Sequence, residues 1–415
     1  MTGDAAPVPR YAGALLVLAV FLLPAWGNRG PSSSSLADLV LLPLAAWVVV
    51  DALRRATVVR TPYLLPAIGL VTAGLVAGAG GRYPGQSLQA VGTDVYLLLV
   101  ALAVTRVVTA RGDWGRTVAL AWVSGALVWS VPLLLSWTGI VTGSFGGVLV
   151  LSDGRAFGTF ANPNLAGSYF AVSLFVALAT LRSTGARVLV SAALLAVLFL
   201  TGSMAALIGT ATGLLGLAIR ALTTALGPGG QHRSWAAAAL ALAGLTTVVA
   251  VGVGGHALAA APSELANSST LHDSFGRLGR SDTGRFELWS LGVQQLGDRT
   301  VVGVGPGAAA PELRQVSDGG KSLHSDILAS LLERGALGAL SLILLVGLVG
   351  AHAWQLGRRD VPWLAAPAIL AAAALSLLPA LVTHEVLHFR HVWLLLGLLA
   401  GARLAATPTA VRSRP

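Results

Sequence analysis

Residues 321–354 read KSLHSDILASLLERGALGALSLILLVGLVGAHAW, and this stretch decides the fold class of the chain. It begins with the only lysine, followed by a histidine and an aspartate, and it becomes almost wholly apolar after Glu333 and Arg334. A helix that crosses a bilayer needs roughly 17–25 residues, so the run 326–354 is too long for one crossing. We expect its first part, about ten residues, to lie at the membrane interface or to line a cavity.

The composition extends this interpretation to the whole chain. Of 415 residues, 55% are hydrophobic and 11% are charged, whereas a soluble domain carries about 25% charged residues. The chain contains 50 glycines, which suit close packing between membrane helices. It has no cysteine, which excludes disulfides and thiolate metal sites. We therefore predict an all-α membrane protein.

Twelve apolar runs come near the length that a membrane-spanning helix needs. The runs 187–201 and 204–222 are separated only by a short turn, so they form a tight hairpin if they are separate helices. In chain order the twelve runs are 11–26, 36–53, 62–79, 92–109, 117–137, 163–181, 187–201, 204–222, 235–256, 326–354, 362–382 and 388–406.

The formal charge of +10 reports the topology of the chain in the membrane. If the N-terminus is cytoplasmic, arginines gather in the segments on its side of the membrane, as the positive-inside rule requires. We therefore expect both termini in the cytoplasm and no nucleic-acid partner. The arginine-rich segments on that side are 54–60, 106–116, 182–187, 358–359 and 403–414.

One long connection, residues 257–325, lies on the predicted outer face. Structureless loops longer than about 15 residues are uncommon and usually functional. Within it, 281–299 predicts a short helix on the membrane surface with Ser281 or Asp282 as its N-cap. VVGVGPGAAA (301–310) is a glycine-rich turn and lacks the Lys-Ser/Thr ending of a phosphate loop. The chain is predicted to divide into N-terminal helices (1–150), a second helical region (151–406) and a cytoplasmic tail (407–415).

The stretch SDGRAFGTFANPNLAGSYF (152–170) concentrates polar groups at the outer end of a predicted span. Pro163 with Asn162 predicts a helix start, with Asn162 as N-cap. Helix N-termini attract anions, so Arg155 and Asn164 beside this terminus are candidate ligands for a diphosphate. An interfacial arginine that extends to water fits Arg155 equally well.

A second outer stretch, GRFELW (284–289), supplies Arg285 and Glu287. The guanidinium of Arg285 matches phosphate oxygens, but a solvated ion pair within the loop explains it as well. Glu287 is a candidate substrate ligand and a candidate general base.

His324 is the leading candidate for a catalytic base, because imidazole titrates near neutral pH and can accept a proton from a hydroxyl. A histidine that packs at the interface is the alternative, and Asp326, Glu287 and Glu385 compete as bases. Arg390 enters the last span in THEVLHFRHVW (383–393) and is a candidate substrate ligand. Since its neighbouring histidines have no matching acidic cluster, we predict no metal site and no cofactor.

Four segments together resemble the O-antigen ligase/polymerase superfamily of bacterial membrane glycosyltransferases. They are RAFGTFANPN (155–164), TGSMAALIG (201–209), GRFELWSLGVQQLGDRTVVGVGPG (284–307) and HSDILASLLERGALG (324–338). Met204 stands where that family usually has an arginine, and Ser325–Asp326 also departs from its pattern. The resemblance covers roughly residues 150–400.

The resemblance implies a GT-C-like helical fold with about twelve transmembrane helices and a large extracytoplasmic loop. It implies a donor glycan linked to undecaprenyl diphosphate, transferred without metal to a glycan or lipid acceptor. Carried over, the diphosphate-binding roles fall on Arg155 and Arg285, and the role of assisting the acceptor falls on His324.

We therefore expect an inverting glycosyltransferase, a polysaccharide polymerase or ligase, in the bacterial cytoplasmic membrane. Its active site is predicted to be extracytoplasmic, where Arg155, Arg285 and His324 converge. Two alternatives remain: a multi-pass transporter or flippase of a lipid-linked glycan, and a peptidoglycan-polymerase-like enzyme that uses a carboxylate of the large loop.

Overall fold

The computed structural model describes most of the chain between residues 8 and 408. The predicted span 235–256, the N-cap candidates Ser281 and Asp282, and most of the loop 257–325 lie outside the described residues. The described ranges are 8–25, 34–55, 61–110, 112–137, 140, 144–145, 148–149, 151–152, 155–225, 285–314 and 323–408.

Helices dominate the described residues, as the sequence predicts. The strands there form three antiparallel ladders of two residues each: β1 (Ser144–Phe145) with β2 (Val148–Leu149), β3 (Leu151–Ser152) with β4 (Arg155–Ala156), and β5 (Arg359–Asp360) with β6 (Thr407–Pro408). The helices are α1 (Arg10–Phe21), α2 (Asp38–Arg55), α3 (Leu64–Ala79), α4 (Pro84–Ala110), α5 (Gly112–Trp137), α6 (Pro163–Thr180), α7 (Thr184–Leu200), α8 (Met204–Ala225), α12 (Arg285–Leu296), α13 (Ala309–Leu313), α14 (Asp326–Leu356), α15 (Pro367–Leu375), α16 (Leu378–Thr383) and α17 (Arg390–Ala405), with a short 3-10 turn at Gly297–Arg299.

Five helices of the described chain are long and apolar enough to cross a membrane: α4, α5, α6, α8 and α14. They indicate a membrane protein. Each predicted run within the described residues contains helix, and α7 and α8 are separate helices joined by Thr201–Ser203. The run 362–382 is not one helix, because it breaks between α15 and α16. The count of twelve spans and the GT-C class stay predictions.

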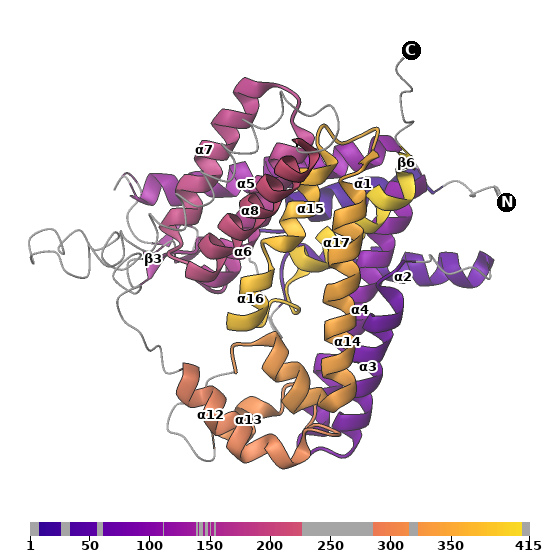
Figure 1. The fold of residues 1–415 in the computed structure, drawn as a ribbon, viewed down its shortest axis with the longest axis vertical. Helices are drawn as coiled ribbons and strands as arrows, with labels where there is room; N and C mark the ends of the chain where they lie inside the picture. Colours follow the sequence, from indigo (N-terminus) through magenta and orange to yellow (C-terminus); the bar gives the residue numbers. More distant parts are fainter. Residues whose placement is uncertain are drawn as a thin grey trace, which may run out of the picture.

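Long helices stand side by side along the longest axis of the molecule (Figure 1). α17 packs along α4, and α14 packs along α3. A Cβ added at Gly397 would lie 2.7 Å from the carbonyl oxygen of Ala101, and Thr105 donates a hydrogen bond to the carbonyl of Gly397. Small residues thus let the backbones of α17 and α4 approach closely, as membrane helix pairs require.

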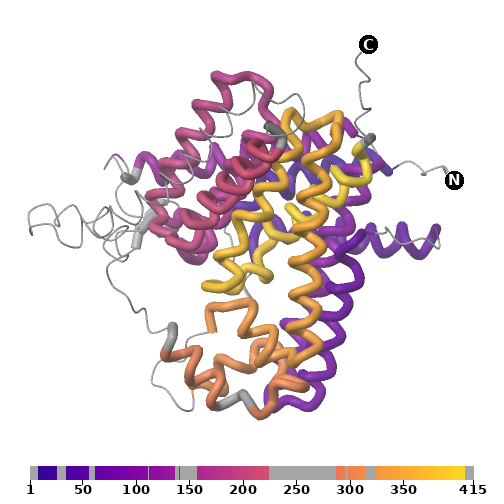
Figure 2. Tube along the Cα trace, viewed as in Figure 1, coloured from indigo at the N-terminus to yellow at the C-terminus, as the bar shows by residue number. Residues whose placement is uncertain are grey.

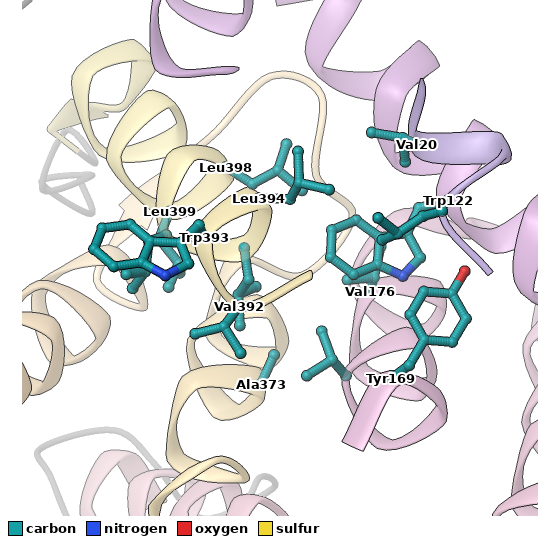
Figure 3. Packing of buried hydrophobic residues seen from close by; sticks show 14 of the residues in the cluster. Val20, Trp122, Tyr169, Val176, Ala373, Val392, Trp393, Leu394, Leu398 and Leu399 are labelled. Atoms are coloured by element: carbon teal, nitrogen blue, oxygen red, sulfur yellow. The ribbon is translucent and has the colours of Figure 1, made fainter. Parts of the chain in front are cut away.

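Aromatic rings fill the apolar core between α5 and α6. Trp122 and Tyr169 are fully buried, and their rings stack with centroids 6.1 Å apart (Figure 3). The indole Nε1 of Trp122 donates to the Ser173 hydroxyl at 2.9 Å, so burial leaves it hydrogen-bonded. These contacts pack α5 against α6.

The two ends of the molecule are formed by different elements. α12 and α13 lie at one end of the long axis, and β6 lies near the opposite end (Figures 1 and 2). Ion pairs join segments that the predicted topology places on the same side: Arg106 with Asp51 at 3.2 Å, and Arg82 with Glu312 at 3.5 Å. The side of the membrane that each end faces stays a prediction.

α14 is broken at Gly335, which has φ 66° and ψ −166°. This backbone conformation suits glycine because a side chain would be strained there. The break divides α14 into a first limb, 326–334, and a second limb, 336–356. It confirms that the first residues of the run 326–354 do not continue the spanning helix.

The glycine-rich turn predicted at 301–310 docks against this break. Backbone N–H groups of Val304 and Gly305 donate to the carbonyls of Leu332 at 3.0 Å and Glu333 at 2.9 Å. Gly303 and Gly305 have φ of 91° and 104°. The turn thus satisfies carbonyls that the broken helix would otherwise leave without partners.

Candidate functional site

His324 lies two residues before α14, next to the N-cap Ser325, in an uncommon backbone conformation. Its φ is 49°, and it is the only non-glycine residue with positive φ in the described chain. Its backbone N–H donates to Oε1 of Glu385 at 3.2 Å. Non-glycine residues in this region cost free energy, so the surrounding contacts must hold His324 in this conformation, and its catalytic role stays a prediction.

Asp326 joins the segment after His324 to a second loop. Its carboxylate accepts backbone N–H groups from Val386 at 2.7 Å and Leu387 at 3.2 Å. Its own N–H donates to the carbonyl of His384 at 3.1 Å. Residues 324–326 and 384–387 therefore form one unit, which we call the junction. These bonds occupy the Asp326 carboxylate, so it acts here as a structural anchor.

Arg390 follows the junction at the start of α17 and binds Asp38 of α2. Its Nη2 lies 2.5 Å from Oδ2 of Asp38, and its Nε contacts the other carboxylate oxygen, which makes the pair bidentate. The Tyr96 hydroxyl donates to the same carboxylate at 2.5 Å. An anionic ligand at Arg390 would compete with Asp38.

A second buried ion pair lies beside the first. Nη2 of Arg334 is 2.6 Å from Oδ2 of Asp94, and both side chains are less than a tenth exposed. His388 Nδ1 approaches the other oxygen of Asp94 at 3.8 Å. Glu333 faces away from this pair, because its Oε1 accepts the backbone N–H of Ala309 at 3.2 Å. Arg334 thus pairs across helices rather than with its neighbour Glu333.

Asp38 and Asp94 are not among the residues predicted from the sequence. Both lie within predicted apolar runs, and an ionisable residue inside such a run marks a functional or paired site. That signal identifies each aspartate, but the identity of its partner comes from the three-dimensional structure.

Asn164 occupies the first turn of α6, half-buried. The prediction for Asn162 is confirmed, since its Oδ1 accepts the Leu165 N–H at 2.8 Å. One turn further, the Ser168 hydroxyl lies 3.1 Å from Nε2 of His391. This contact places the start of α6 beside the start of α17, so Asn164 lies in the same region as Arg390.

Glu287 is exposed on α12. Two residues later, Nε1 of Trp289 donates to the carbonyl of Leu323 at 2.8 Å, directly before His324. This bond fixes α12 beside the junction. The structure thus joins the segments that carry Glu287 and His324.

Arg155 and Arg285 are described by their backbones alone. Arg155 pairs with Ser152 in the β3–β4 ladder, and Arg285 is the first residue of α12. Their side chains lie outside the described part of the chain. The convergence of Arg155, Arg285 and His324 stays a prediction.

Two cavities flank the junction. One, of about 200 Å³, lies among α14, α15, α16 and α17, and its lining is apolar, with Val386 and Leu387 among the lining residues. The other, of about 620 Å³, lies between α12 and the first limb of α14, with Trp289 and Ser325 in its wall. Asp326 follows Ser325 and binds Val386 and Leu387. The junction therefore separates an apolar cavity from a wider one.

Within the described residues, no three His, Asp or Glu side chains gather closely enough to hold a metal ion. No protein-family model matches the chain, and no curated protein matches it. The resemblance to the O-antigen ligase/polymerase superfamily therefore stays a prediction from the sequence.

Proposed function

We propose that the chain is a membrane glycosyltransferase that moves a glycan from an undecaprenyl-diphosphate donor to an acceptor hydroxyl at the outer face of the bacterial cytoplasmic membrane. One observation carries the proposal: His324 belongs to the junction, whose Val386 and Leu387 line an apolar cavity and whose Ser325 lines a wider cavity beside α12. The apolar cavity suits a donor that comes from lipid. Most of the wider cavity's lining is apolar as well, but Ser290, Gln294 and Ser325 supply polar groups that an acceptor hydroxyl can bond.

The apolar cavity supports a lipid-linked donor. It is bounded by the second limb of α14 and by α17, and its lining side chains include Leu342, Leu345 and Leu396. An isoprenoid chain gains free energy by contact with such a surface. The diphosphate that follows the chain would then reach the junction.

The reaction is a single displacement. The acceptor hydroxyl oxygen attacks the anomeric carbon, the bond from that carbon to the diphosphate oxygen breaks, and the glycosidic bond forms with inversion. His324 accepts the hydroxyl proton, and undecaprenyl diphosphate leaves with the electron pair of the broken bond. The protein must orient the hydroxyl and stabilise charge on the leaving group.

The arginines of the site do not contribute equally to that stabilisation. Arg334 and Arg390 are each paired with an aspartate at hydrogen-bond distance, so their charge is largely neutralised within the protein. Arg155 and Arg285 are then the cations that the proposal assigns to the diphosphate. They remain assigned from the sequence.

The experiment that tests the proposal is a transfer assay with the purified full-length protein and an undecaprenyl-diphosphate glycan, with and without EDTA. His324→Asn is the main variant, because asparagine tolerates positive φ and lacks the imidazole. His352→Asn is the matched control, since His352 lies half-buried near the far end of α14 and bonds the carbonyl of Leu348. We expect transfer to fall at least about a hundredfold in His324→Asn and to persist in the control.

The remaining arms separate the alternatives. Full transfer by His324→Asn together with its loss in Glu287→Gln would assign catalysis to the loop carboxylate of a peptidoglycan-polymerase-like enzyme. Loss of transfer with EDTA would remove the metal-independent mechanism. Loss of transfer in Arg155→Gln and Arg285→Gln is expected, because both guanidiniums are assigned to the diphosphate.

The donor cavity has its own test. Gly350 lines it on α14, and a Cβ at this position would meet no atom within 4 Å. Gly350→Leu would fill the cavity and raise KM for the lipid-linked donor. Gly347→Leu is the matched control, since it lies on the same helix, is equally open and does not line the cavity. Equal KM values for the two variants would argue against the donor cavity.

A transporter or flippase of a lipid-linked glycan is the second candidate. Two observations favour it: α14 is broken at Gly335, and the buried pairs Arg334–Asp94 and Arg390–Asp38 join different helices. Broken helices and paired charges are typical of transporter sites. Movement of a labelled lipid-linked glycan from one leaflet of a proteoliposome to the other, without transfer to any acceptor, would favour the transporter or flippase.

A further inference from the structure

A third cavity, of about 810 Å³, lies between the C-terminal ends of α8 and α14 and the start of α15. It lies at the opposite end of α14 from the junction and belongs to the predicted cytoplasmic side. Among the described residues, Arg220, Arg358 and Arg359 line it together with one acidic residue, Asp360. The lining therefore carries an excess of positive charge.

Arg220 is held in a fixed orientation in this cavity. Its guanidinium donates to the carbonyl oxygens of Gly357 and Trp354. A Cβ added at Gly357 would lie 2.4 Å from Cζ of Arg220, so the space for the guanidinium exists because residue 357 is a glycine. The guanidinium is thus positioned before any ligand arrives.

Trp354 brings a second guanidinium close to the first. Cζ of Arg220 lies 5.9 Å from the centroid of the Trp354 ring, and Cζ of Arg358 lies 5.3 Å from it. Both distances fall within the range of cation–π contact. Two like charges held around one ring repel each other, and a bound anion would relieve that repulsion.

The chemistry of the lining selects the anion. Guanidinium groups bind phosphate oxygens through paired hydrogen bonds. α8, whose Arg220 and Thr223 line the cavity, also exposes Leu215, Ile219 and Leu222 on one helical face, and an acyl chain of a bound lipid can pack on that face. Tryptophan and arginine are also typical of the lipid headgroup level.

We propose that this cavity binds a phosphate group, supplied by the headgroup of an anionic phospholipid in the leaflet at this end of the molecule. The site is independent of the junction and of the proposed transfer reaction. A phospholipid bound there would bridge α8, α14 and α15 and hold these helices together.

The test uses the purified full-length protein and measures lipid retention and thermal stability in two arms. One arm adds phosphatidylglycerol or, for comparison, phosphatidylcholine, and the other adds inorganic phosphate at matched ionic strength. The variants are Arg358→Gln/Arg359→Gln and Gly357→Ala. Arg116→Gln is the matched control, because Arg116 is an exposed arginine on the same predicted side, outside the cavity.

We expect phosphatidylglycerol to bind about tenfold more weakly to the double variant than to wild type or the control. Gly357→Ala should weaken it as well, because it displaces the guanidinium of Arg220. If inorganic phosphate stabilises wild type but not the double variant, and phosphatidylglycerol has no effect, the cavity binds phosphate from a soluble molecule and not from a lipid. Equal binding of both lipids, or equal binding by wild type and the double variant without any phosphate effect, would overturn the proposal.

Discussion

The arginines at the two ends of the molecule are used in opposite ways. Beside the junction, Arg334 and Arg390 are buried and each faces an aspartate from another helix. At the third cavity, Arg220 and Arg358 lie around Trp354, and Arg220 bonds backbone carbonyls, which leave its positive charge in place. The first arrangement cancels charge and links helices. The second concentrates charge where an anion can reach it.

The difference follows from how desolvated each guanidinium is. A buried charge without a counter-ion costs several kcal/mol, so Arg334, with only 5% of its side chain exposed, requires Asp94. A half-exposed guanidinium keeps part of its hydration, and carbonyl oxygens and an aromatic ring are enough to hold it. Burial thus decides which arginines require a carboxylate partner.

Removing the counter-ion of a buried arginine should have the largest effect. Asp94→Ala leaves Arg334 charged and desolvated, and we expect a loss of about 3–5 kcal/mol in the free energy of unfolding. Thermal unfolding of the purified protein in detergent measures it. The double variant Asp94→Leu/Arg334→Leu should recover most of the loss, because neither charge is then buried. A single variant as stable as wild type would show that Arg334 is hydrated.

Gly335→Ala should cause the next largest loss in the free energy of unfolding. Gly335 follows Arg334, and the break at this glycine sets the direction in which Arg334 reaches Asp94. Alanine is strained at φ 66°, ψ −166°, which costs about 1–3 kcal/mol. Its Cβ would also lie 2.4 Å from the carbonyl oxygen of Val301. Gly347→Ala is the matched control on the regular part of α14 and should stabilise the helix by up to about 1 kcal/mol.

If Gly335→Ala and Gly347→Ala unfold at the same temperature, the break in α14 is not needed for the native fold. If Gly335→Ala loses transfer activity but keeps its unfolding temperature, the break in α14 is needed for activity and not for stability. Both results are obtained from the same two purified variants.

The sequence predicts helices better than it predicts what polar residues do. Apolar runs locate the helices because lipid-facing and packed surfaces both demand apolar side chains over a full helix length. Pro163 and Asn162 locate the start of α6 because capping is a local interaction. The prediction of one helix over 362–382 is wrong. α15 and α16 are both apolar, so the hydropathy of the run does not show the break between them.

The pairing of charges is not local, so it escapes the sequence. Asp38 lies 352 residues from Arg390, and Asp94 lies 240 residues from Arg334. Neither spacing indicates a contact. His324 was selected for its chemistry, while the backbone conformation and the bond to Glu385 that mark its position come from the fold.

An ion pair with an exposed arginine and a mostly buried glutamate tests the role of burial. Arg82 lies 3.5 Å from Glu312, but 60% of its side chain is exposed. Surface pairs contribute about 0–1 kcal/mol, so Arg82→Gln should lower the unfolding temperature far less than Asp94→Ala does. Salt should reduce this small effect further. A loss close to that of Asp94→Ala would contradict the distinction between buried and exposed arginines.

Arg358→Gln should have the smallest effect in protein freed of lipid. The variant loses a cation–π contact with Trp354, worth about 0.5–1 kcal/mol, and it relieves repulsion between Arg358 and Arg220 of similar size. We therefore expect the free energy of unfolding to change by less than about 0.5 kcal/mol. At high salt the variant should be less stable relative to wild type than at low salt. Salt screens the repulsion between Arg358 and Arg220 in wild type, so removing Arg358 then brings less relief, while the lost packing on the Trp354 ring is unchanged. A loss of several kcal/mol in low salt would show that the cavity arginines hold the fold as those beside the junction do, and the contrast between the two ends would disappear.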